Sequence, residues 1–271
     1  MIYLIIFIAI IGLIFLIGKI NLSLKFDKEV KQLFSESKNI SDKVFTFKQL
    51  VGLPKPVRRY FRYVLKEGQP YISYVRLQHD GQFKSDLKKC WENIIGEQYF
   101  TTENPGFIWK GTTSMFIARD MYITHEGRLI VTIFSTVNVV NIHEKKQYNE
   151  SELLRWLSES VWFPTNLLPS KNLRWTAINN SSAKLTFNYQ GLSLSYTITF
   201  NEKGEITEME TRRYMDEKRI ETWIIKPNSY KENNGVIIPL NAEVFWRLQE
   251  GDFNYANFFV KKIEYDIPEK F

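Results

Sequence analysis

The chain opens with almost unbroken apolar residues from Met1 to Gly18, and only then becomes a mixture of polar and apolar positions. A helix that crosses a bilayer needs about 20 apolar residues, with roughly 17 as the lower limit. Ile20 and Leu22 extend the run around Lys19, whose ammonium can reach the interface. No basic residue precedes the run and no Ala-x-Ala site follows it, which favours a retained anchor over a cleaved signal. We predict a single-pass cell-membrane protein with a transmembrane anchor over residues 1–22.

Residues 23–68 are predicted to form a basic, helical juxtamembrane segment. Residues 25–37 carry a loose helical pattern, and Pro56 is suited to begin a second helix whose stripe is Val57, Tyr60, Phe61, Val64 and Leu65. From Lys19 to Lys66 there are 12 Lys/Arg against 4 Asp/Glu, a balance of +8 in a chain of net charge +6. This excess predicts the lipid bilayer as a partner. The Arg/Tyr run at 58–63 also suits bases, but the anchor favours lipid headgroups over nucleic acid.

The side of the membrane is indicated by two weaker signals. The basic flank follows the anchor, so the positive-inside rule places the globular domain in the cytoplasm. The single cysteine, Cys90, cannot form an internal disulfide, which suits a reducing compartment. We therefore expect a cytoplasmic domain.

From Tyr71 onward the apolar period changes to two, which predicts strands. Asp80-Gly81 is interpreted as a turn. The predicted strands are 71–77, 89–100, 107–116, 117–123, 128–142, 173–178, 183–189, 192–200, 205–214, 219–226, 236–248 and 253–267.

One helix, predicted over 149–161, interrupts the strands. Asn149 followed by Glu152 is typical of a capping box, and Pro164 prevents continuation. Its apolar stripe is Leu153, Leu154, Trp156, Leu157 and Val161.

These elements predict a mainly β fold with some α-helix, in one domain over residues 69–271. Short connections favour antiparallel neighbours, and 11 or 12 strands are about the limit for an open sheet without curling. We expect a large curved antiparallel sheet or incomplete barrel, with the helix packed on its concave side or across its mouth. A β-sandwich is the alternative.

Motifs for familiar chemistry are missing from the sequence. There is no G-x-S-x-G elbow, no glycine-rich phosphate loop, and no histidine spacing that matches a metal site. His79, His125 and His143 are interpreted as solvated turn residues, and Cys90 as a structural thiol. We therefore predict neither a metal nor a cofactor.

The helix carries Arg155 and Glu159 four residues apart, opposite its apolar stripe. The ordinary interpretation is an exposed ion pair worth about 0.3–0.5 kcal/mol. The functional interpretation has this face in a ligand cavity, with Arg155 as headgroup anchor and Glu159 as acid or base.

Aromatic residues are abundant, with 7 Trp, 14 Tyr and 20 Phe, and many of them are predicted in mid-strand. They either fill a curved sheet or line an apolar pocket. The candidate ligand-binding residues are Trp109, Tyr122, Arg155, Glu159, Trp162, Arg213 and Trp246.

Several segments resemble a family of bacterial membrane-associated proteins of unknown function. The most specific are Arg155 to Glu159, running into Trp-Phe-Pro-Thr at 162–165, and Pro-Gly-Phe-x-Trp at 105–109. The other matching segments are 53–60, 81–83 with Trp91, 120–122, and Gly235 with Pro239, Trp246 and Tyr255. The resemblance covers most of the chain from about Leu53 and implies no activity.

The predicted architecture itself is similar to that of periplasmic lipoprotein carriers, which bind acyl chains between sheet and helix. That resemblance implies a lipid ligand, and it implies an extracytoplasmic domain, in conflict with the charge of the flank. Three hypotheses follow. The chain is a membrane-anchored binding module for a lipid or other apolar ligand, an enzyme on a membrane-derived substrate with Glu159 or Asp120 as acid/base, or a non-catalytic scaffold for a protein partner that the sequence does not identify.

Overall fold

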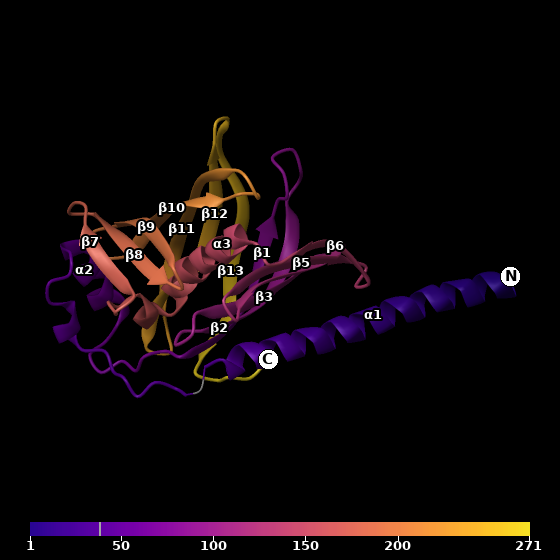
Figure 1. Ribbon diagram of the computed structural model, residues 1–271, viewed down its shortest axis with the longest axis horizontal. Helices are drawn as coiled ribbons and strands as arrows, with labels where there is room; N and C mark the ends of the chain where they lie inside the picture. The colour runs from indigo at the N-terminus through magenta and orange to yellow at the C-terminus, as the bar shows by residue number, and fades with distance from the viewer. Residues whose placement is uncertain (38) are drawn as a thin grey trace.

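A computed structural model describes residues 1–37 and 39–271, and its dominant element is one antiparallel sheet (Figure 1). The sheet has 13 strands in the order β6-β5-β4-β3-β2-β1-β13-β12-β11-β10-β9-β8-β7. The strands are β1 (Tyr74–Phe83), β2 (Glu92–Thr101), β3 (Gly106–Thr112), β4 (Phe116–Ile123), β5 (Glu126–Ile133), β6 (Val137–Ile142), β7 (Leu173–Ala177), β8 (Ser182–Tyr189), β9 (Leu192–Phe200), β10 (Ile206–Tyr214), β11 (Ile220–Asn233), β12 (Val236–Leu248) and β13 (Gly251–Tyr265).

The strand order explains the curvature. Two meanders, β1–β6 and β7–β13, are joined side by side where the first strand pairs with the last. In the described part of the chain, the edge strands β6 and β7 do not pair with each other, so the sheet curls without closing. The predicted curved sheet or incomplete barrel is confirmed, and the β-sandwich alternative is wrong.

Three α-helices and three short 3-10 helices complete the described fold. They are α1 (Ile2–Ser35), η1 (Phe47–Leu50), α2 (Lys55–Val64), α3 (Lys146–Glu159), η2 (Ser160–Trp162) and η3 (Pro164–Leu167). The helix α3 lies in the hollow of the sheet, where it contacts β3, β4 and β5 of one meander and β9 and β10 of the other (Figure 1). It also connects the two unpaired edge strands along the chain.

The helix α1 is continuous for 34 residues and passes the predicted boundary at residue 22 without a break. Its apolar N-terminal part is exposed and is long and apolar enough to cross a membrane. Its C-terminal part instead packs on the outer, convex face of the sheet. Figure 1 shows the free part leading away from the domain.

The contact between α1 and the convex face is apolar with one charged pair. Buried Phe26, Val30, Leu33 and Phe34 of α1 pack against Tyr74, Tyr99, Ile108 and Met121. Successive side chains along a strand point to opposite faces of the sheet. The neighbours of these sheet residues, such as Phe100 and Phe107, therefore point into the core on the concave face. Arg119 of β4, with a side chain only 1 % exposed, pairs with Glu29 of α1. The second half of α1 is therefore part of the folded domain.

Three local predictions are wrong. Asp80-Gly81 is no turn but lies inside β1, beside an irregularity at Gln78/His79. The predicted strand 128–142 is two strands, because the chain reverses through positive-φ residues Phe134 and Ser135. Lys145, and not Asn149, is the N-cap of α3. The Asn149 side chain instead accepts a hydrogen bond from the Gly127 N–H at 2.8 Å, which attaches α3 to β5.

We expect Glu29→Ala to release the second half of α1 from the sheet. The buried Arg119 would lose its counter-charge, and breaking such a pair costs about 3–5 kcal/mol. At 1.4 kcal/mol per decade, thermolysin cleavage of the detergent-solubilised protein within residues 25–37 should be at least about a hundredfold faster. Gln32→Ala, an exposed position in the same turn of helix, is the control. Equal cleavage rates for the two variants would contradict this account.

Candidate functional site

The candidate site lies between α3 and the concave face of the sheet. The apolar stripe of α3, with Leu153, Leu154 and Leu157, is buried against the sheet as predicted. Two hydrogen bonds between α3 and the sheet fix the distance of the helix from the sheet. Trp156 Nε1 donates to the Thr101 carbonyl at 3.0 Å, and Tyr196 Oη donates to the Leu154 carbonyl at 3.0 Å. The polar side of the helix is thereby held against the sheet as well.

Arg155 is the centre of the first charged group. Its guanidinium donates to Asp120 Oδ2 of β4 at 2.5 Å and to Glu159 Oε1 at 2.9 Å. Gln98 of β2 donates to the other Glu159 oxygen at 2.7 Å. The Arg155 and Glu159 side chains are only 12 % and 13 % exposed, so the interpretation as an exposed surface pair is wrong. The guanidinium also lies 5.1 Å from the ring centre of Trp109.

Arg213 of β10 is the centre of the second charged group. It donates to Glu152 Oε1 at 3.1 Å and to the Ser151 carbonyl at 3.2 Å, both on α3. Its guanidinium lies 4.4 Å from the ring centre of Trp223 and 5.8 Å from that of Trp246. The two arginines thus attach one helix to both meanders, β4 on one side and β10 on the other. We call Asp120, Glu152, Arg155, Glu159 and Arg213 the buried charge cluster.

Burial shifts the pKa values of this cluster. Burial raises the pKa of Glu159, against the opposing effect of Arg155. Burial, and then the adjacent Asp120, raise the pKa of Glu152 well above its ordinary range. Burial lowers the pKa of Arg155 and of Arg213, but the surrounding carboxylates outweigh it and the net direction is upward. Both guanidinium groups are therefore charged.

A single proton would balance the cluster, which holds three carboxyl groups and two guanidinium groups. Asp120 Oδ1 and Glu152 Oε2 are both buried without a donor among the described residues. Asp120 acts on Glu152 as a like charge and as a hydrogen-bond partner. A proton on Glu152 satisfies both oxygens and leaves two negative charges opposite two positive charges. Two carboxyl groups that share a site commonly retain one proton in this way.

A neutral histidine lies beside the first group. His79 is 2 % exposed, and its Nε2 accepts a hydrogen bond from Trp109 Nε1 at 2.7 Å. The imidazole covers Gly96 on the neighbouring strand so closely that a Cβ there would overlap its ring. The interpretation of His79 as a solvated turn residue is therefore wrong. Burial lowers its pKa to about 4.

The structure brings five of the seven predicted ligand-binding residues into two neighbouring groups, Trp109 with Arg155 and Glu159, and Trp246 with Arg213. The other two lie elsewhere in the same core. Tyr122 is 1 % exposed on β4, and Trp162 donates from Nε1 to the Pro239 carbonyl at 3.1 Å. The aromatic partners Trp223 and Tyr255, which share a 3.0 Å hydrogen bond, were not predicted as site residues. The period-two pattern of their strands places both on the concave face, so the sequence pattern could have identified them as site residues.

The space between α3 and the sheet is packed with buried side chains of both, such as Leu153, Leu157 and Phe107. One hollow in the described structure is an open depression at the β8–β9 turn, beside Lys171 and Tyr189. Another, of about 10 Å³, lies beside Leu33 of α1. Neither hollow lies under α3. A ligand on the concave face would therefore require α3 to move.

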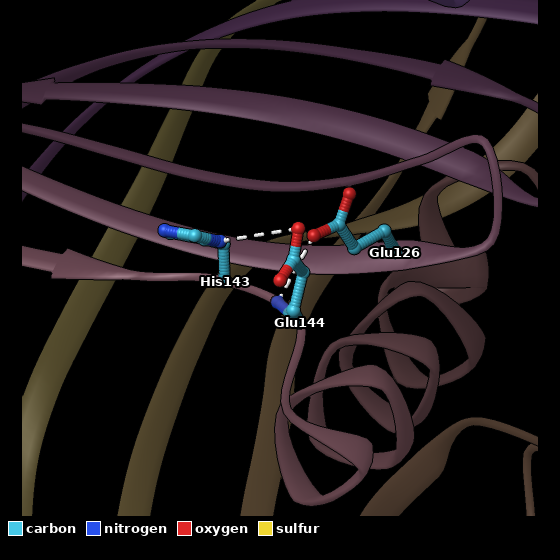
Figure 2. A group of neighbouring side chains, drawn as sticks. All are labelled: Glu126, His143 and Glu144. Carbon is cyan, nitrogen blue, oxygen red and sulfur yellow. Dashed lines mark hydrogen bonds and ion pairs between the residues drawn. The ribbon is translucent and has the colours of Figure 1, made fainter.

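A separate group near the surface consists of half-buried Glu126 with exposed His143 and Glu144, near the start of α3 (Figure 2). One ligand atom from each residue lies within 4.8 Å of the others. The Glu126 carboxylate already accepts hydrogen bonds from Arg128 and from the Glu144 N–H. The group is thus an ordinary surface ion-pair arrangement.

Comparison with known proteins gives one family and 12 similar chains of solved structure, among them the following two. A LolA superfamily protein from Nitrosomonas europaea, NE2245, superimposes with a TM-score of 0.43 and 8% identity, over 77% of this chain and 91% of that chain. A putative outer membrane lipoprotein-sorting protein domain from Vibrio parahaemolyticus has a TM-score of 0.40 and 8% identity, over 71% and 85%. No curated protein matches the sequence. The model of a family of unknown function matches residues 51–265, which confirms the resemblance to such a family.

We expect Glu152→Gln to change the free energy of unfolding at pH 7 by less than about 1 kcal/mol, because glutamine mimics the protonated carboxyl toward Asp120. Glu152→Ala should cost about 3 kcal/mol, because Arg213 and Asp120 would each lose a buried hydrogen-bond partner. Denaturant titration of the detergent-solubilised protein, followed by tryptophan fluorescence, measures both. A glutamine variant as unstable as the alanine variant would show that Glu152 is ionised.

Acidification should destabilise the protein through His79. Its pKa is about 4 when folded and 6.5 when unfolded, so the unfolded chain binds the extra proton between these values. The stabilisation is complete above pH 6.5 and falls by about 3 kcal/mol as the pH drops to 4. His79→Gln, whose amide oxygen can still accept from Trp109, should lose this part of the pH dependence. The same denaturant titrations at pH 4 to 7 test it, and parallel curves for both proteins would contradict it.

Proposed function

The chain belongs to this family of unknown function, DUF6920, and we propose that it is a membrane-anchored binding module for a lipid or another apolar ligand. The ligand would lie between α3 and the concave face of the sheet. The observation that carries the proposal is the buried charge cluster, set among aromatic rings at the interface between α3 and the sheet.

The cluster makes the α3 contact easy to separate. Charges buried in an apolar surrounding lose their hydration, and their mutual attraction often only offsets that loss. Ser151 Oγ lacks a partner in the described structure, and Asp120 Oδ1 and Glu152 Oε2 depend on one shared proton, which weakens the interface further. Elements that move to admit a ligand are drawn from such low-stability contacts. The helix α3 is thus suited to act as a lid.

Separation of α3 would expose a surface suited to an acyl chain. Trp109, Phe107, Trp223 and Trp246 lie on the concave face against the two arginines. Apolar walls with few polar groups are the usual form of a small-molecule site. Arg155 would exchange Asp120 or Glu159 for an anionic headgroup, which a guanidinium can bind in bidentate geometry.

The enzyme alternative rests on one observation, the raised pKa of the buried Glu159. Raised carboxyl pKa values are common at catalytic sites, but they also occur in structural ion-pair networks. Glu159 accepts from both Arg155 and Gln98, so both of its oxygens are occupied. The binding proposal uses the cluster without requiring a reaction, and we prefer it for that reason.

The proposal is tested by titrating the full-length protein in detergent with a fatty acid brominated in mid-chain. All seven tryptophans lie outside α1, and bromine quenches tryptophan on contact. We expect saturable quenching, which Arg155→Met should weaken about tenfold through loss of the headgroup contact, about 1.4 kcal/mol. Arg212→Met, at an exposed position on β10 next to Arg213, removes an arginine outside the cluster and is the control. Quenching that never saturates, or equal affinities for both variants, would contradict the proposal.

A further inference from the structure

The turn between β5 and β6 presents apolar side chains to solvent. Phe134, Val137 and Val139 are 59 %, 53 % and 53 % exposed. Phe134 occupies a left-handed backbone position, with φ 50, in a tight turn where Asn or Gly is usual. Such a placement of a large aromatic residue is strained, and strained residues are concentrated at functional places. We call Ile133–Val139 the hairpin tip.

The hairpin tip touches the apolar half of α1. The rings of Phe134 and Phe15 are 5.7 Å apart. Gly18 lies directly under the turn, since a Cβ there would approach Thr136 Cγ2 to 2.6 Å and the Ser135 carbonyl oxygen to 2.7 Å. The glycine therefore permits the close approach. In Figure 1 the β5–β6 turn reaches out along α1 toward its free end.

The position of this contact along α1 gives its depth in a bilayer that α1 crosses. At 1.5 Å per residue, the 17 steps from Met1 to Gly18 span about 26 Å, less than the roughly 30 Å of a bilayer's hydrocarbon core. Where α1 crosses a bilayer, Phe15 and Gly18 therefore lie inside that core. The first charged residue, Lys19, follows immediately. A side chain that contacts Phe15 shares its depth.

The attachment of α1 to the sheet keeps the hairpin tip at this level. Arg119 and Glu29 form a buried pair, and Phe26 and Val30 pack on the convex face. The helix has no break between this contact and Gly18. The domain therefore cannot withdraw the tip without also releasing α1.

We propose that the hairpin tip inserts into the hydrocarbon region of the bilayer beside α1, as a second membrane contact of the domain. The lipid acyl chains would cover Phe134, Val137 and Val139. Continuity with the apolar helix identifies the bilayer as the occupant, because α1 already lies against one side of the tip. The proposal does not depend on whether the concave face binds a ligand.

The test places a nitroxide on the tip of the full-length protein. Cys90→Ser removes the exposed native thiol, and Phe134→Cys accepts the label. The protein is reconstituted into vesicles of phosphatidylethanolamine and phosphatidylglycerol. Power-saturation spectroscopy then compares collisions with oxygen, which enters lipid, and with a polar nickel chelate, which does not. Leu87→Cys, an apolar residue that is 52 % exposed in the β1–β2 turn, is the matched control.

We expect the label at 134 to collide with oxygen freely and with the nickel chelate about tenfold less often than the label at 87, because hydrocarbon excludes the polar complex. A second variant, Gly18→Leu, should increase nickel access at 134 by pushing the turn away from α1. Equal nickel access at 134 and 87 would overturn the proposal. A label at 134 shielded from both reagents would overturn it too, and would indicate a protein contact such as a second copy of the chain.

Discussion

The fold depends on covering the concave face of a sheet that cannot close on itself. Thirteen strands curl enough to create a deep apolar surface, but the edge strands β6 and β7 remain apart. The helix α3 covers that surface while it connects the two edges along the chain. Burial of Leu153, Leu154 and Trp156 against both meanders is therefore what holds the halves in one curvature. The pairing of β1 with β13 supplies the other link.

The same interface contains a cluster of buried charges. Arg155 and Arg213 are paired and rest on aromatic rings, but two of the carboxyl oxygens around them depend on one shared proton. A purely apolar helix face would hold the sheet at least as well, since replacing buried ion pairs by apolar residues is often neutral or stabilising. The retention of five charged side chains at this place is thus better explained by recognition or movement than by stability.

The sequence predicted the class of fold and the buried faces of most elements. The period-two pattern of β9 and the helical stripe at 153–157 each depend only on the spacing of apolar residues within one element. The sequence could not predict the state of Arg155 and Glu159, which look like any exposed pair until β2 and β4 are placed over them. The burial of His79 could not be predicted either, because only the pairing register with Gly96 creates the space that its imidazole occupies. Asn149 has a capping pattern, but its partner Gly127 is 22 residues away. The helical pattern over 25–37 was predicted, but its continuity with the anchor was not, because the surface on which it packs exists only in the folded sheet.

The docking of α1 on the convex face has a mechanical consequence. Transmembrane helices tilt when their apolar length exceeds the thickness of the bilayer. A helix joined to its domain by a loop would tilt alone, but α1 is unbroken from its apolar N-terminal part to the residues that pack on Tyr74 and Tyr99. Any change of its angle would therefore rotate the sheet and the hollow that holds α3. In a chain anchored as proposed above, bilayer thickness, rather than the loops, would set the direction in which that hollow faces.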